Sequence, residues 1–174
     1  MTASRLRVCF VCTGNICRSP TAEVVFRHLV EEAGLAAQVE VDSAGTGPWH
    51  AGHDMDPRAR HTLLAHGYRP HEHVAKQFVA PDFAGRDLVV ALDRGHLARL
   101  ANLARLADDP EEASAALSLL RGYDPAVGGE TELDVPDPYY DDAEGFEIVL
   151  DQIERACAGL LGSLRPQLTG SQAS

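Results

Sequence analysis

The chain alternates short apolar runs with longer segments in which apolar residues recur at helical spacing. Three apolar runs predict strands, at residues 5–11, 39–43 and 87–92. Four periodic segments predict helices, at residues 20–33, 57–67, 94–106 and 143–164. A further run at 115–120 is ambiguous, and only the alternation of elements favours a strand there.

Alternating strands and helices predict an α/β fold with a doubly wound parallel sheet and helices on both of its faces. The length suits one domain with a sizeable core, and we assign it to residues 1–164. Residues 165–174 are mostly small and polar, so we expect a disordered tail.

The most informative segment is the loop after the first predicted strand, which reads Cys-Thr-Gly-Asn-Ile-Cys-Arg over residues 12–18 and is followed by Ser19-Pro20. Ser19 is a good N-cap residue and Pro20 suits the first helical position. A strand, a tight loop and a helix N-terminus together form an anion site, because backbone N–H groups converge there and the helix dipole favours negative charge.

This loop also carries the residues for nucleophilic chemistry on a phosphate. A cysteine at position 12 would be held as the thiolate, which is the reactive form. Gly14 and Asn15 readily adopt left-handed backbone angles, and Arg18 offers a planar fork for two phosphate oxygens. The Ser19 hydroxyl is placed to donate to the thiolate. The segment predicts cysteine-based hydrolysis of a phosphate ester, with Thr13, Gly14, Asn15, Ile16, Cys17 and Arg18 forming the phosphate-binding loop.

Composition limits the classes of partner that we expect the protein to bind. The formal net charge of −11 argues against nucleic acid or an acidic membrane surface as a partner. The four cysteines follow no disulfide framework, and no signal-peptide or transmembrane pattern is present, so we expect a reducing cytoplasm. Neither the pair His71 and His73 nor the pair His50 and His53 follows a ligand pattern, so we expect no metal and no cofactor.

Several segments together resemble the low-molecular-weight protein tyrosine phosphatases. They keep that family's order from residue 5 to about residue 160, and they read VCFVCTGNICRSPTAE, Asp42–Thr46, Trp49-His50, Asp56–Ala59, His73–Gln77, Leu92–Arg94 and Asp137–Tyr140. The resemblance implies a four-stranded parallel sheet. It also implies hydrolysis of phosphotyrosine in protein substrates through a phosphocysteine on Cys12, with inorganic phosphate as product. We expect a monomer or a weak dimer.

The reaction needs a proton donor for the leaving oxygen, and several aspartates crowd residues 134–142. Asp137 stands out because Pro136 and Pro138 restrict the backbone on both sides of it. The resemblance assigns Asp137 as the general acid and, after the first step, as the general base.

The resemblance also assigns residues around the loop. Asn15, Ser19, Ser43 and His73 match hydrogen-bonding residues that hold the loop backbone, and Trp49, Tyr139 and Tyr140 match the aromatic walls of the pocket. From the residues alone, His73 would read as an exposed loop histidine. Cys17 is close enough in sequence to trap an oxidised Cys12 as a reversible disulfide, whereas Cys9 and Cys157 read as packing residues.

Three alternatives to this function remain. An arsenate reductase of this fold would need redox cysteines downstream of the loop, and none lies between Cys17 and Cys157. A protein-arginine phosphatase usually carries Thr at the position of Ile16, and the apolar residue favours an aromatic ester. A phosphotyrosine-binding module without activity would lack the cysteine or the acid, and both are present here.

Overall fold

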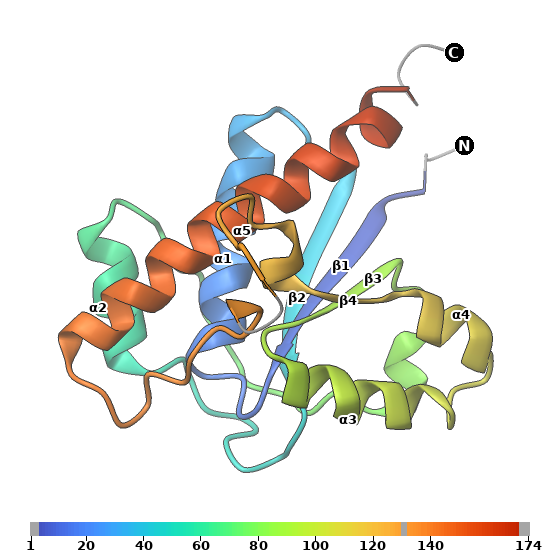
Figure 1. Ribbon diagram of the computed structural model, residues 1–174, viewed down its shortest axis with the longest axis horizontal. Helices are drawn as coiled ribbons and strands as arrows, with labels where there is room; N and C mark the ends of the chain where they lie inside the picture. The colour runs from blue at the N-terminus through green and yellow to red at the C-terminus, as the bar shows by residue number, and fades with distance from the viewer. Residues whose placement is uncertain (1–3, 130–131, 171–174) are drawn as a thin grey trace.

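The computed structural model describes residues 4–129 and 132–170 and contains one parallel sheet of four strands in the order β2-β1-β3-β4 (Figure 1). The strands are β1 (Leu6–Cys12), β2 (Val39–Gly45), β3 (Leu88–Ala91) and β4 (Leu117–Leu119). Residue Cys12 at the end of β1 pairs with Gly45 at the end of β2, and Val11 pairs with Ala91 at the end of β3. The carboxyl ends of three strands therefore meet at one edge of the sheet.

Helices cover both faces of this sheet (Figure 1). They are α1 (Arg18–Glu32), α2 (Pro57–Ala65), α3 (Arg94–Ala104), α4 (Pro110–Ala115) and α5 (Ala143–Gly170), with short 3₁₀ turns at Ala80–Phe83 and Leu120–Tyr123. Helices α1, α2 and α5 pack together on one face, whereas α3 and α4 pack on the other. The predicted doubly wound α/β fold is confirmed.

Strand β1 lies inside the sheet and supplies side chains to both cores. Val8, Phe10 and Cys12 belong to the core under α1 and α5, whereas Cys9 and Val11 belong to the core under α3. This alternation follows from the two-residue period of a strand and explains why nearly every residue of β1 is apolar. Cys12 therefore leaves the sheet on the side where α1 begins.

Several predicted boundaries differ from the structure. Helix α1 begins at Arg18, so Ser19 lies in its first turn and not at the N-cap, which is Cys17. The ambiguous run at 115–120 contains only the three-residue strand β4. The preceding helix α4 was not predicted, although Asp109 caps it and Pro110 opens it.

The tail prediction is wrong for residues 165–170. Helix α5 continues to Gly170 because Leu168 lies on its apolar face and is buried in the same core as Leu164. Pro166 does not end the helix. Residues 171–174 of the predicted tail lie outside the described residues. Within the described part of the chain, no helix combines the length and the apolar character needed to cross a membrane.

Candidate active site

The loop between β1 and α1 turns its backbone inward at Asn15, whose φ of 58° lies in the left-handed region. Among the described residues, no hydrogen bond is donated by the backbone N–H groups of residues 14–17. These donors precede the first turn of α1, where the helix dipole adds partial positive charge. This arrangement can accept an anion, because several N–H donors and the positive end of the helix dipole lie together.

The thiol of Cys12 is buried at the base of this loop, with 3% of the residue exposed. Its Sγ lies 2.9 Å from Oγ of Ser19. Because a thiolate can only accept, the Ser19 hydroxyl is the donor whenever Cys12 is ionised. The first turn of α1 thus brings a hydrogen-bond donor to the sulfur.

Asn15 links the loop to three other segments. Its Nδ2 donates to Oγ of Ser19 at 2.8 Å and to Oγ of Ser43 at 2.9 Å. Its Oδ1 accepts from the backbone N–H of Lys76 at 3.1 Å, and its backbone carbonyl accepts from Nε2 of His73 at 2.7 Å. The side chain is fully buried, so these bonds satisfy its polar groups and support the left-handed backbone.

Gly45 at the end of β2 allows the loop to approach the sheet. A Cβ at this position would lie 2.6 Å from the carbonyl oxygen of Thr13 and 3.2 Å from the backbone nitrogen of Asn15. Only glycine leaves room for the loop backbone here. The path of the loop therefore depends on β2 as well as on its own residues.

Arg18 is buried and its guanidinium is held in place by two elements. Nη1 donates to Oδ2 of Asp93 at 2.9 Å and to the backbone carbonyl of Val135 at 3.0 Å. Nη2 lies 3.7 Å from Oδ2 of Asp137. These contacts fix the plane of the guanidinium beside the loop before any ligand binds.

His96, in the first turn of α3, completes the surroundings of Arg18. Its Nε2 lies 2.8 Å from Oγ1 of Thr13 and 3.4 Å from Nη2 of Arg18, and its Nδ1 lies 3.1 Å from Oδ1 of Asp93. Burial and the Arg18 guanidinium lower the pKa of His96 to about 4. The imidazole is therefore neutral near pH 7 and accepts at Nε2.

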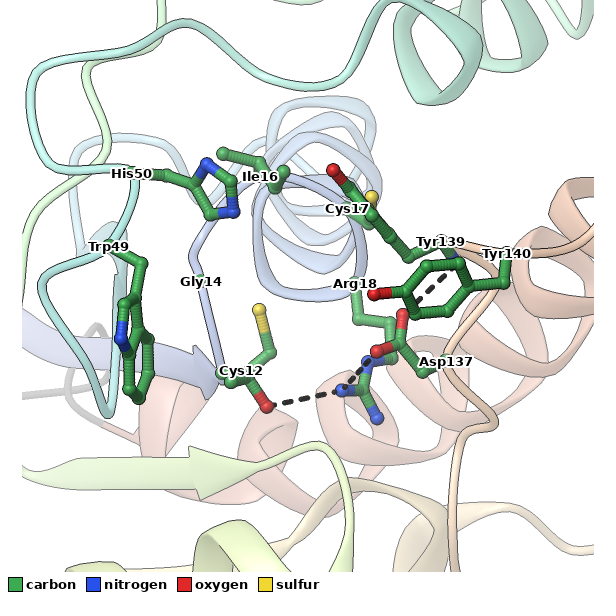
Figure 2. A pocket seen from close by; sticks show the side chains of 11 residues that line it. Cys12, Gly14, Ile16, Cys17, Arg18, Trp49, His50, Asp137, Tyr139 and Tyr140 are labelled. Atoms are coloured by element: carbon green, nitrogen blue, oxygen red, sulfur yellow. Dashed lines mark hydrogen bonds and ion pairs between the residues drawn. The ribbon is translucent and has the colours of Figure 1, made fainter.

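The loop opens into a cavity of about 340 Å³ (Figure 2). The Cys12 thiol points into the cavity between two groups of side chains. Trp49 and His50 stand on one side, and Asp137 and Tyr139 stand on the other. Tyr140 also lines the cavity but is 92% exposed, so it forms the rim and not an enclosed wall.

Asp137 comes from the loop before α5. Its Oδ1 accepts from the backbone N–H of Tyr139 at 3.1 Å, and half of its side chain is exposed. Arg58 in α2 donates to the carbonyl oxygen of Tyr139 at 2.9 Å and anchors the segment from outside. The carboxyl group is thus held at the cavity wall and remains open to solvent, as a group that exchanges protons requires.

The other cysteines differ from Cys12 in their surroundings. Cys17 lines the same cavity, and burial raises the pKa of its thiol well above the usual range, with the nearby Asp56 carboxylate adding to the shift. Burial likewise raises the pKa of Cys9 and Cys157, which lie in the two cores. All four cysteines are free.

The structure brings the predicted loop, Asp137 and the three aromatics to one cavity, and it brings Ser43 and His73 to the back of the loop. The sequence analysis gave no role to Asp93, Lys76, His50 or His96. The position of Asp93 directly after a buried strand is a signal that could have identified it, because β3 neighbours β1. His50 and Lys76 lie in segments that carry the family resemblance, but no residue pattern indicates what either side chain contacts.

Comparison with known proteins identifies a family that the chain matches over nearly its whole length. The profile of the family described as low molecular weight phosphotyrosine protein phosphatase matches residues 7–169. A low molecular weight protein-tyrosine-phosphatase from Streptomyces coelicolor is 56% identical over 168 residues, which cover 96% of this chain and 98% of that protein.

Solved structures of phosphatases share the fold of this chain. A protein tyrosine phosphatase from Entamoeba histolytica, with Hepes in its active site, superimposes with a TM-score of 0.84 at 31% identity, covering 93% of this chain and 98% of that one. A Drosophila arginine phosphatase superimposes with a TM-score of 0.82 at 31% identity, covering 91% and 97%. Likeness of fold alone therefore does not separate phosphotyrosine from phosphoarginine.

Proposed function

Because the chain belongs to the low-molecular-weight phosphotyrosine protein phosphatase family, we propose that Cys12, Arg18 and Asp137 carry out its reaction, the hydrolysis of phosphotyrosine in proteins. One observation carries the assignment. Cys12, Arg18 and Asp137 all line one cavity. The loop that supplies the first two also has backbone N–H groups, at residues 14–17, that donate to none of the described residues.

In the first step, Sγ of Cys12 attacks phosphorus, a P–S bond forms and the P–O bond to the tyrosine breaks. Asp137 donates its proton to the departing phenolate oxygen. The loop N–H groups and Arg18 bind the phosphoryl oxygens, whose charge they stabilise in the transition state. The Ser19 hydroxyl, 2.9 Å from Sγ, stabilises the thiolate before the attack.

In the second step, the Asp137 carboxylate takes a proton from a water molecule. The resulting hydroxide forms a P–O bond, the P–S bond breaks, and inorganic phosphate leaves with the Cys12 thiolate restored. The partial exposure of Asp137 supports this role because water reaches the carboxylate from the open side of the cavity. Neither step draws on a metal or a cofactor.

The cavity favours an aryl phosphate. Trp49 and Tyr139 offer flat aromatic surfaces on opposite sides, and Ile16 adds an apolar branched side chain at the loop. A phenyl ring fills such a space, whereas the guanidinium of phosphoarginine would be desolvated against Ile16. We propose phosphotyrosine proteins as substrates in a reducing cytoplasm, which keeps the cysteines free.

The test is hydrolysis of three matched peptides that carry phosphotyrosine, phosphoserine or phosphoarginine, in EDTA, by the parent protein and by the Cys12→Ser variant. We expect turnover of the phosphotyrosine peptide alone and its complete loss in Cys12→Ser. The Cys17→Ser variant is the matched control, since it removes a thiol from the same cavity and leaves the proposed nucleophile in place.

Other outcomes reject separate parts of the proposal. Turnover mainly of phosphoarginine would reject the substrate but keep Cys12 as nucleophile. Turnover that survives in Cys12→Ser would reject the nucleophile. Tight phosphate binding without turnover of any peptide would make the chain a binding module.

A further inference from the structure

A second cluster of side chains lies behind the loop, on the side away from the cavity. Glu23 in α1 and the two histidines His71 and His73 bring three potential ligand atoms within 4.8 Å of one another. None of the three lines the catalytic cavity. The sequence did not indicate this cluster because Glu23 lies far from the histidines along the chain.

The hydrogen bond made by His73 determines which of its ring nitrogens is free. The carbonyl of Asn15 can only accept, so Nε2 of His73 carries the proton that it donates at 2.7 Å. Nδ1 is therefore the ring nitrogen that His73 has left to offer a metal ion. Histidines that ligate a metal characteristically donate their other ring N–H to a carbonyl or carboxylate in this way.

Glu23 supplies an unsatisfied buried oxygen. The residue is 5% exposed, and its Oε2 has no hydrogen-bond partner among the described residues. Oε2 nevertheless lies 2.6 Å from Nε2 of His71, so the two atoms are in contact without the alignment of a hydrogen bond. Arg27 lies 3.9 Å from Oε1 and also donates to the carbonyl of Val41.

The 2.6 Å between Oε2 of Glu23 and Nε2 of His71 is shorter than the roughly 3.3 Å that separates two ligand atoms of a tetrahedral Zn²⁺. A metal ion would therefore push the partly exposed His71 outward and replace its direct contact with Glu23. Two imidazole nitrogens and one carboxylate oxygen form a donor set for Zn²⁺, with water as the fourth ligand. His71 is 29% exposed on its side chain, which gives a metal and its water a path from solvent.

We propose that Glu23, His71 and His73 form a binding site for a divalent transition metal ion, with Zn²⁺ as the best fit. Bound metal would join α1 to the segment that contains both histidines. Since His73 also holds the carbonyl of Asn15, the ion would restrain the catalytic loop from behind. The site is separate from the reaction, in which the metal takes no part.

The test is calorimetric titration of Zn²⁺ into the Cys12→Ser protein, in which the Cys12 thiolate cannot compete for the metal. Thermal unfolding with and without Zn²⁺ gives a second readout that does not depend on activity. We expect one Zn²⁺ per chain and a higher melting temperature with the metal, because a ligand that binds the folded state stabilises it.

Two variants in the Cys12→Ser background locate the site. His71→Gln removes one ligand, so we expect at least about tenfold weaker binding and loss of the thermal shift. His66→Gln is the matched control, because His66 also lies 2.6 Å from a glutamate, Glu147, but both side chains are about half exposed. We expect it to bind Zn²⁺ like the parent.

Either of two results would overturn the proposal. One is binding of less than one Zn²⁺ by the Cys12→Ser protein. The other is binding by His71→Gln with unchanged affinity. Because no readout uses catalysis, failure here leaves the proposed phosphatase mechanism untouched.

Discussion

The hydroxyl oxygen of Ser19 lies 2.9 Å from Sγ of Cys12. Ser19 belongs to the first turn of α1, the helix that follows the catalytic loop. The same oxygen accepts from Nδ2 of Asn15 at 2.8 Å, so its single proton points either to the sulfur or to the carbonyl oxygen of Ala44 at 3.3 Å. An ionised sulfur is the nearer and the stronger acceptor of the two. One side chain therefore joins the nucleophile to the residue that shapes the loop.

Replacing Ser19 tests that link. A hydrogen bond to a charged group contributes about 1.5–3 kcal/mol, so Ser19→Ala should slow alkylation of Cys12 by iodoacetamide at pH 6 by about 10- to 100-fold. Ser43→Ala is the matched control, because it removes the other hydroxyl bound by Asn15 and leaves the sulfur contact intact. Equal slowing in both variants would show that Ser19 acts only through the loop.

Replacing Asp137 tests the proton transfer. Asp137→Asn should reduce kcat/KM, which reports the first step alone, by about 10²- to 10⁴-fold for phenyl phosphate, whose leaving group needs a proton, and by much less for p-nitrophenyl phosphate. Asp141→Asn, in the same acidic loop, should leave both rates near the parent values. An equal loss of rate for the two substrates in Asp137→Asn would contradict the assignment of Asp137 as the acid.

The lowered pKa of His96 predicts a pH-dependent stability. A histidine has a pKa near 6.5 when unfolded and about 4 here, so the unfolded chain binds more protons between these values. The stabilisation is complete above pH 6.5 and is lost as the pH falls toward 4. Urea unfolding measures how much the free energy of unfolding falls between pH 7.5 and pH 5. We expect this fall to be about 1–2 kcal/mol smaller in His96→Gln than in the parent protein. An unchanged difference would show that His96 is not a neutral buried group.

The contact between Gly45 and the loop predicts a steric effect. Gly45→Ala should lower the free energy of unfolding by about 1–3 kcal/mol and abolish most activity, because its Cβ would meet the carbonyl oxygen of Thr13 at 2.6 Å. Gly162→Ala, on an open face of α5, should instead stabilise the protein by about 0.5–1 kcal/mol. Full activity in Gly45→Ala would show that the loop does not depend on this contact.

The two cysteines in the cavity predict a reversible oxidation. Peroxide converts the Cys12 thiolate to a sulfenic acid, and the Cys17 thiol then displaces water to form a disulfide. Because the pKa of Cys17 is raised, the disulfide should form faster as the pH increases. Mass spectrometry after mild peroxide treatment should show the Cys12–Cys17 disulfide, and irreversible oxidation of Cys12 should replace it in Cys17→Ser. A sulfinic acid on Cys12 beside a reduced Cys17 in the parent would contradict this.

The sequence predicted the parts of the site that depend on local order. A strand end, a Gly-Asn turn and a helix start lie within residues 6–20, so the loop could be predicted from residues that are adjacent in the sequence. The contacts of Arg18 with Asp93 and His96 could not, because they depend on β3 lying next to β1. The unsatisfied oxygen of Glu23 likewise becomes visible only when α1 meets His71.

The weaker predictions failed where tertiary packing outweighed composition. Residues 165–170 contain proline, glutamine and glycine, yet α5 continues through them because Leu168 is buried in the core. Strand β4 is too short for its pattern to identify, and it is defined by its pairing with β3.

The catalytic loop is held almost entirely by segments that follow it in the chain. Asn15 depends on Ser43, His73 and Lys76, and Arg18 depends on Asp93. A ribosome synthesises the nucleophile among the first residues but supplies the carbonyl of Val135 that anchors Arg18 only after three quarters of the chain. The growing chain therefore carries Cys12 long before it can hold a phosphate over it, and it can become active only after residue 135 has been synthesised.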